Sequence, residues 1–122
     1  MNALIRLFLV LAMTSVAFGC GRWHDHDDDV VVESQSLVSV SGGCVVRGTV
    51  RNEGGHTLRV FLSWRAFNRR DREIGLADAE IRDLPRDSSR AFESTRFRDF
   101  DGDRPSCSEI DRIRRNESAF RD

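Results

Sequence analysis

Hydrophobic and polar residues alternate along much of this chain, beginning at Val30 and continuing to Phe97. Alternation with a period of two places successive side chains on opposite faces of a β-strand. Glycine, asparagine, proline and clusters of charged residues separate the alternating runs, as they do at turns. The pattern predicts strands at residues 30–40, 42–52, 56–68, 74–81 and 90–97.

The clearest of these runs is LRVFLSWRAF, residues 58–67. Its even-numbered positions are all hydrophobic and include Trp64, whereas its odd-numbered positions carry arginine, serine and phenylalanine. The preceding run places on one face Cys44, Val46, Gly48 and Val50. Short strands of this kind, repeated with turn signals between them, predict an all-β sandwich.

The end of the chain gives a weaker signal. Ile110 and Ile113 are three positions apart, a spacing that fits a helical turn as well as a strand. We predict a folded domain at residues 30–115 and a tail at residues 116–122.

The first residues have the layout of a secretory signal peptide. Arg6 precedes an apolar run at residues 7–13, and small residues follow. The run is too short for a comfortable transmembrane span. We predict that residues 1–19 are removed and that the fold is built from the remainder.

Cys20 follows the triplet Ala17, Phe18 and Gly19, an arrangement that resembles the lipobox of bacterial lipoproteins. Cleavage before Cys20 and acylation of its thiol would anchor the chain to a membrane of the bacterial cell envelope. Gly21, where aspartate would indicate inner-membrane retention, favours the outer membrane, with the domain in the periplasm. An ordinary signal peptidase would also cut here and would leave a secreted domain without lipid.

The net charge argues against nucleic-acid binding, and the cysteine content predicts a disulfide. The chain has 19 basic and 20 acidic residues, a net charge of −1, so it lacks the positive field of a nucleic-acid-binding protein. With Cys20 assigned to the N-terminus, Cys44 and Cys107 are left to form a disulfide in an oxidising compartment. That bond would stabilise the domain by about 4 kcal/mol. The alternative is two buried free thiols.

Two segments have candidate metal ligands. His24 and His26 stand in the acidic segment GRWHDHDDD, where they could hold a divalent ion, but such segments also serve as solvated tethers. We interpret residues 20–29 as a lipidated N-terminus and tether, and keep metal binding as the alternative. The acids of DFDGD, residues 99–103, alternate as in calcium loops, but a turn built on Gly102 is favoured.

No catalytic arrangement is evident. Outside the tether the only histidine is His56, in a turn signal without a placed acidic partner, so we predict no enzyme activity and no cofactor. The expected contacts are a membrane, through the acyl chains, and a cell-envelope protein of unknown identity. The charged loops at residues 53–57 and 68–73 are the candidates for binding it.

Several motifs in order resemble the FxLYD domain, which occurs mostly in bacterial exported proteins and lipoproteins. GTVRN, VFLSWRAFNRRDREIG and LPRDSSRAFE follow one another as in that family, with the signature at residues 64–68. Every signature position is altered, mostly to a residue of similar shape, for example Trp64 for phenylalanine and Phe67 for tyrosine. The resemblance covers residues 34–115 and implies an immunoglobulin-like β-sandwich without a catalytic residue set. Its most specific positions are Gly48, Val50, Asn52, Trp64, Phe67, Gly75, Leu84, Pro85 and Phe92.

Overall fold

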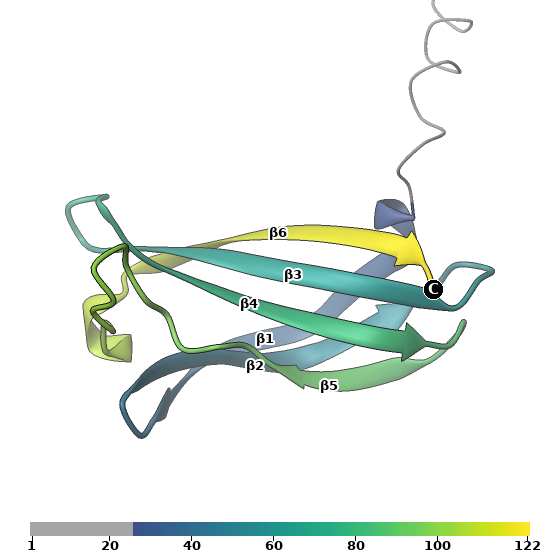
Figure 1. Ribbon diagram of the computed structural model, residues 1–122, viewed down its shortest axis with the longest axis horizontal. Helices are drawn as coiled ribbons and strands as arrows, with labels where there is room; N and C mark the ends of the chain where they lie inside the picture. The colour runs from purple at the N-terminus through teal and green to yellow at the C-terminus, as the bar shows by residue number, and fades with distance from the viewer. Residues whose placement is uncertain (1–25) are drawn as a thin grey trace, which may run out of the picture.

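The structure is a computed structural model that describes residues 26–122. In that range the only helices are two short 3-10 turns, and none is long and apolar enough to cross a membrane. Figure 1 shows how the elements follow one another along the chain. They are η1 (Asp27–Asp29), β1 (Val30–Val40), β2 (Gly43–Asn52), β3 (Leu58–Phe67), β4 (Glu73–Leu84), β5 (Ser89–Glu93), η2 (Cys107–Glu109) and β6 (Arg112–Arg121).

The strands form two antiparallel sheets that face each other (Figure 1). One sheet has the order β1-β2-β5 and the other has the order β4-β3-β6. In immunoglobulin nomenclature these correspond to strands A-B-E and C′-C-F. The predicted all-β, immunoglobulin-like sandwich is confirmed, whereas the predicted signal peptide lies outside the described residues.

The core lies between the sheets and is built from the hydrophobic faces that the alternation predicts. Trp64 at its centre is fully buried and stacks on Phe92, with ring centroids 5.5 Å apart. Its Nε1 donates to Gln35 Oε1 at 3.0 Å, so the buried indole N–H has a hydrogen-bond partner. Burial of a side chain of this size contributes about 3 kcal/mol. The other buried side chains of β3 are Leu58, Val60, Leu62, Ala66 and Phe67.

A bulge in β1 depends on one glycine of β2. The pairing register shifts between Val32 and Ser34, which brings the Ser34 carbonyl over Gly48. A Cβ atom at position 48 would lie only 1.9 Å from that carbonyl oxygen. Only glycine allows the two backbones to approach so closely.

The predicted tail at residues 116–122 is wrong, because the chain up to Arg121 forms β6 and pairs with β3. The strand pattern is weak there because β6 lies at the edge of its sheet. Because side chains alternate between the two faces of a strand, Arg115 and Glu117 lie on the same face of β6 as Ala119. These two side chains pair with each other, with Nε and Oε2 3.2 Å apart.

The start of the domain also differs from the prediction. The tether was expected to occupy residues 20–29, but its last part forms η1 and belongs to the fold. Asp27 Oδ1 accepts a hydrogen bond from the Ala119 N–H at 2.8 Å, which ties η1 to β6. Residues 20–25 lie outside the described part of the chain.

Candidate functional site

The strands run lengthwise, so the connecting loops gather at two opposite ends of the sandwich (Figure 1). We call the end with η1 and loops 53–57 and 85–88 the tether end. We call the other end, with loops 41–42, 68–72 and 99–106, the distal end. The two loops proposed from sequence as binding candidates therefore lie at opposite ends of the molecule.

At the tether end two histidines meet. The rings of His26 and His56 make an edge-on contact with centroids 5.5 Å apart, and His26 Nδ1 lies 2.9 Å from Asp29 Oδ2. His24 and Cys20 lie outside the described residues. Within residues 26–122 no group of three or more His, Cys, Asp or Glu side chains is arranged to hold a metal ion. Metal binding by His24 and His26 stays a prediction.

One buried side-chain amide connects several segments of the chain at the tether end. Asn52 is fully buried, and its Nδ2 donates to the carbonyls of His56 at 2.7 Å and Leu84 at 3.0 Å. Its Oδ1 accepts from the Gly54 N–H at 2.9 Å. One side chain thus joins the β2–β3 connection to the end of β4, and every polar atom of the amide has a partner.

The carboxyl group of Asp122 makes a further link at this end. The Asp83 N–H donates to Asp122 Oδ2 at 2.7 Å, and Arg59 Nη2 lies 3.4 Å from Oδ1. The hydrogen bond from Asp83, and secondarily the charge of Arg59, hold the pKa of Asp122 below its usual range. Its contribution to stability is present above the unfolded-state pKa and is lost as the pH falls through the lower folded-state value.

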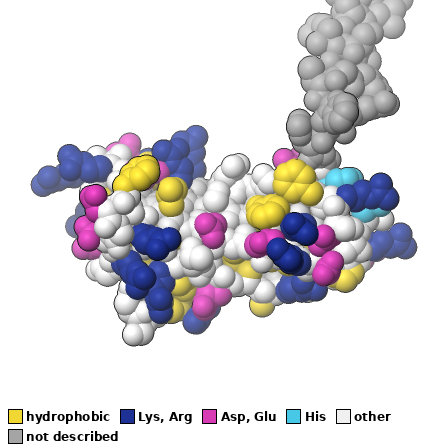
Figure 2. Space-filling view, in the orientation of Figure 1, with side chains coloured by type: hydrophobic (Ala, Val, Ile, Leu, Met, Phe, Trp, Pro, Cys, Tyr) yellow, Lys and Arg dark blue, Asp and Glu magenta, His cyan; other side chains and the backbone are white. Residues whose placement is uncertain are grey.

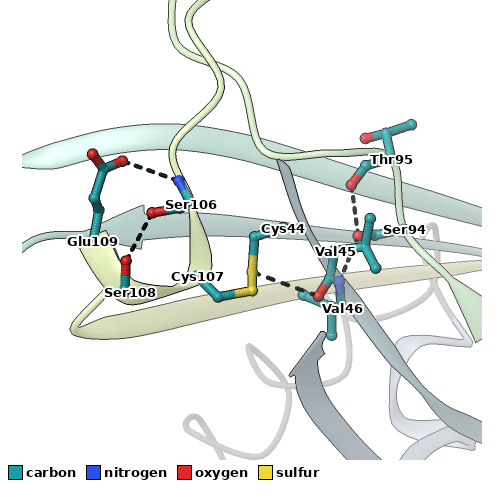
Figure 3. Close-up of a disulfide and its surroundings, with 9 residues drawn as sticks. All are labelled: Cys44, Val45, Val46, Ser94, Thr95, Ser106, Cys107, Ser108 and Glu109. Atoms are coloured by element: carbon teal, nitrogen blue, oxygen red, sulfur yellow. Dashed lines mark hydrogen bonds between the residues drawn. A yellow bond between two sulfur atoms is a disulfide. The ribbon is translucent and has the colours of Figure 1, made fainter. Parts of the chain in front are cut away.

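At the distal end a disulfide joins Cys44 of β2 to Cys107 of η2 (Figure 3). The two Cα atoms are 5.0 Å apart and 63 positions separate the residues in sequence. Because η2 leads into β6, the bond links the two sheets covalently. The predicted pairing of these cysteines is confirmed.

Residues 68–72, NRRDR, form the first of two matching loops at the distal end, and we call it the basic loop. Asn68 Oδ1 accepts the N–H groups of Arg70 and Arg72, each at 3.0 Å. The fourth residue, Asp71, has a φ of 63° and pairs with Arg112, whose Nε donates to Oδ1 at 3.0 Å. The Asn68 side chain thus holds the loop in shape, as asparagine does in such turns.

Residues 99–103, DFDGD, repeat this arrangement and form what we call the acidic loop. Asp99 Oδ1 accepts the N–H groups of Asp101 and Asp103, each at 2.9 Å, and the fourth residue, Gly102, has a φ of 87°. The prediction of a turn at Gly102 is confirmed. The first of the alternating acids, Asp99, thus binds the loop's own backbone.

A hollow of about 580 Å³ lies between the basic and acidic loops. Buried Pro105 and half-buried Ile74 supply its apolar part. The rest of the wall is polar and consists of Asn68, Arg69, Arg70, Arg72, Asp99, Asp103, Arg104, Ser108 and Glu109. A second hollow of about 450 Å³, beside Leu76 and Phe100, also has Asp99 in its wall.

The charges of the two loops are largely unmatched. Among residues 26–122, Arg69, Arg70 and Arg72 make no ion pair, nor do Asp101 and Asp103. All of these side chains are exposed. Figure 2 shows arginine and acidic side chains next to one another over the distal end, at the left of the view.

An exposed aromatic side chain stands in the same region. Phe100, in the acidic loop, is 98% exposed, the largest value among the exposed large hydrophobic side chains of residues 26–122. A phenylalanine so fully in water contributes nothing to the core. Its place beside charged loops is typical of binding surfaces, where aromatic residues and arginine are enriched.

The sequence-based prediction gave the loop at residues 68–73 as a binding candidate and the acidic loop as a turn, favoured over a calcium loop. It missed that the two meet across one hollow. A signal was present, because both loops begin with Asn or Asp and place a residue suited to positive φ at the fourth position.

Comparison of the chain with protein-family models, curated proteins and solved structures finds no match. The resemblance to the FxLYD domain stays a prediction. Asn52 and Trp64, which belong to that resemblance, are both fully buried.

Proposed function

We propose that this chain is a membrane-anchored lipoprotein of the bacterial cell envelope, whose β-sandwich is a non-catalytic interaction or structural module. Acyl chains on Cys20 supply the anchor and the outer membrane is its favoured location. Each buried methylene contributes about 0.8 kcal/mol, so two or more chains hold a protein at a bilayer without a spanning helix.

The observation that carries the proposal is the separation between the tether end and the distal end. His26 lies six positions after Cys20, a reach of about 20 Å at full extension. An anchor at Cys20 therefore keeps the tether end near the bilayer. The ten residues of β3 add about 33 Å, which is enough for the distal end and its exposed charges to face away from the membrane.

The anchor is tested by Cys20→Ser in cells fed an alkyne-bearing palmitate analogue. We expect the variant to lose the label and to move from the membrane fraction to the soluble periplasmic fraction. Ser36→Ala, on an exposed position of β1, is the matched control and should keep both label and location. Retention of Cys20→Ser in the membrane fraction would contradict the anchor.

The choice of membrane is tested separately. Gly21→Asp should shift the labelled protein from the outer to the inner membrane on a sucrose gradient. An unchanged distribution would contradict the proposed sorting while leaving the anchor itself intact.

A further inference from the structure

The distal end presents opposite charges that the molecule does not pair internally. The basic loop offers Arg69, Arg70 and Arg72, while its one acid, Asp71, is already engaged by Arg112. The acidic loop offers Asp101 and Asp103. Both loops border the same hollow, yet no ion pair within residues 26–122 joins one loop to the other.

A surface with a basic half and an acidic half is complementary to itself. In a two-fold symmetric contact the same patch occurs on both partners, and each pairing between two positions occurs twice. Turning one copy by 180° places its basic loop opposite the acidic loop of the other, and the reverse contact forms at the same time. A purely anionic ligand would match the arginines and would be repelled by the aspartates.

We propose that the distal end binds a second copy of this chain, in a two-fold symmetric contact between the basic loop of each copy and the acidic loop of the other. The contact surface lies within the folded domain, so the proposal does not depend on the lipid anchor.

The exposed aromatic ring gives this contact an apolar centre. Phe100 follows Asp99 at the tip of the acidic loop and is 98% exposed. The hollow beside the basic loop, of about 580 Å³, has Ile74 and Pro105 in its wall. In the two-fold contact Phe100 of each copy enters this hollow of the other, where arginine side chains can lie against its face.

The loops are held in their shapes before any contact forms. Asn68 and Asp99 each accept two backbone N–H groups of their own loop, at 2.9–3.0 Å. Preformed loops lose little conformational freedom on binding, which lowers the entropic cost of association. Even so, two five-residue loops per copy bury less than a standard interface of about 1,600 Å², so we expect weak, concentration-dependent association.

The test uses the Cys20→Ser chain purified without detergent, so that neither lipid nor a third thiol drives association. Sedimentation equilibrium from low micromolar to millimolar concentration should show a monomer–dimer equilibrium that weakens as salt rises, because exposed charges are screened. A chain that stays monomeric across this range at low salt overturns the proposal.

Two charge reversals then locate the surface. Arg69→Glu/Arg70→Glu makes both loops acidic, and Asp101→Arg/Asp103→Arg makes both basic. Each variant alone should associate at least tenfold more weakly than the parent, because like charges face each other. Arg86→Glu/Arg121→Glu, with the same change in charge at exposed positions of the tether end, should associate like the parent.

The decisive measurement is the equimolar mixture of the two distal variants. Every contact in the mixed dimer joins an acidic loop to a basic one, so we expect association to be restored to within about tenfold of the parent. Restoration also shows that both variants are folded. A mixture that stays monomeric overturns the proposal, as does equal weakening by the tether-end control.

The apolar part of the contact is tested by Phe100→Ser. Its side chain is fully exposed in the single chain, so we expect unchanged thermal stability together with a tenfold or greater loss of association. Unchanged association would contradict the proposal that Phe100 of each copy enters the hollow of the other.

Discussion

The two ends of this sandwich are closed in different ways. At the tether end the loops are joined by a buried amide, Asn52, whose polar atoms all face other parts of the chain. At the distal end the sheets are joined by the Cys44–Cys107 disulfide, and each neighbouring loop is held by its own first side chain. The distal loops are therefore held mainly by their own side chains, which leaves the charged groups of Arg69, Arg70, Arg72, Asp101 and Asp103 available to other molecules.

The largest effect should come from removing the covalent link at the distal end. A loop closed over 63 positions contributes about 4 kcal/mol to the free energy of unfolding. We expect Cys44→Ala/Cys107→Ala to lose at least that amount in urea unfolding. The parent measured with dithiothreitol is the control and should behave similarly. A loss below about 1 kcal/mol would show that the distal end is held mainly by other contacts.

The tether end should respond next to the loss of its buried amide. Asn52→Ala leaves two carbonyls and one N–H without their partner, and we expect a loss of about 3 kcal/mol in the free energy of unfolding. Asn116→Ala, at an exposed position of β6, should change it by less than about 0.5 kcal/mol. Equal losses in the free energy of unfolding for the two variants would show that the Asn52 amide does not stabilise the tether end.

The smallest effect should come from the side chains that hold the distal loops. Asn68→Ala and Asp99→Ala each remove the acceptor of two solvent-exposed hydrogen bonds from backbone N–H groups, so we expect about 1 kcal/mol for each. Asn68→Asp and Asp99→Asn retain that oxygen and should cost less than about 0.5 kcal/mol. A large difference between the two loops would contradict their equivalence.

Strands with one face buried in the core could be predicted from the sequence, because their hydrophobic residues recur at every second position. β3 is the best case, because every even-numbered side chain from Leu58 to Ala66 is buried in the core. The disulfide was also predictable, since the sequence predicts a separate role for the third cysteine, Cys20. β6 was not, because Arg115 and Glu117 interrupt its inner face and pair with each other at the sheet edge.

The distal surface could not be predicted because it depends on tertiary structure. About 30 residues separate the basic and acidic loops, and nothing local indicates that they meet. They are brought together where Leu76 and Arg98 exchange two backbone hydrogen bonds, at 2.9 and 3.1 Å. This bridge, together with two hydrogen bonds between Thr95 and Asp78, holds the segment after β5 against β4 and carries the chain to the distal end.

The disulfide also determines how the domain responds to mechanical force. Residues 45–106 lie inside the covalent loop, so a pull between the two chain ends of the domain cannot extend them. The crosslink therefore prevents about 210 Å of chain, measured at full extension, from being pulled out by the force. A domain pulled from its first described residue and from its last strand would release only the chain on either side of the crosslink, and beyond that length the tension would be carried by the sulfur–sulfur bond.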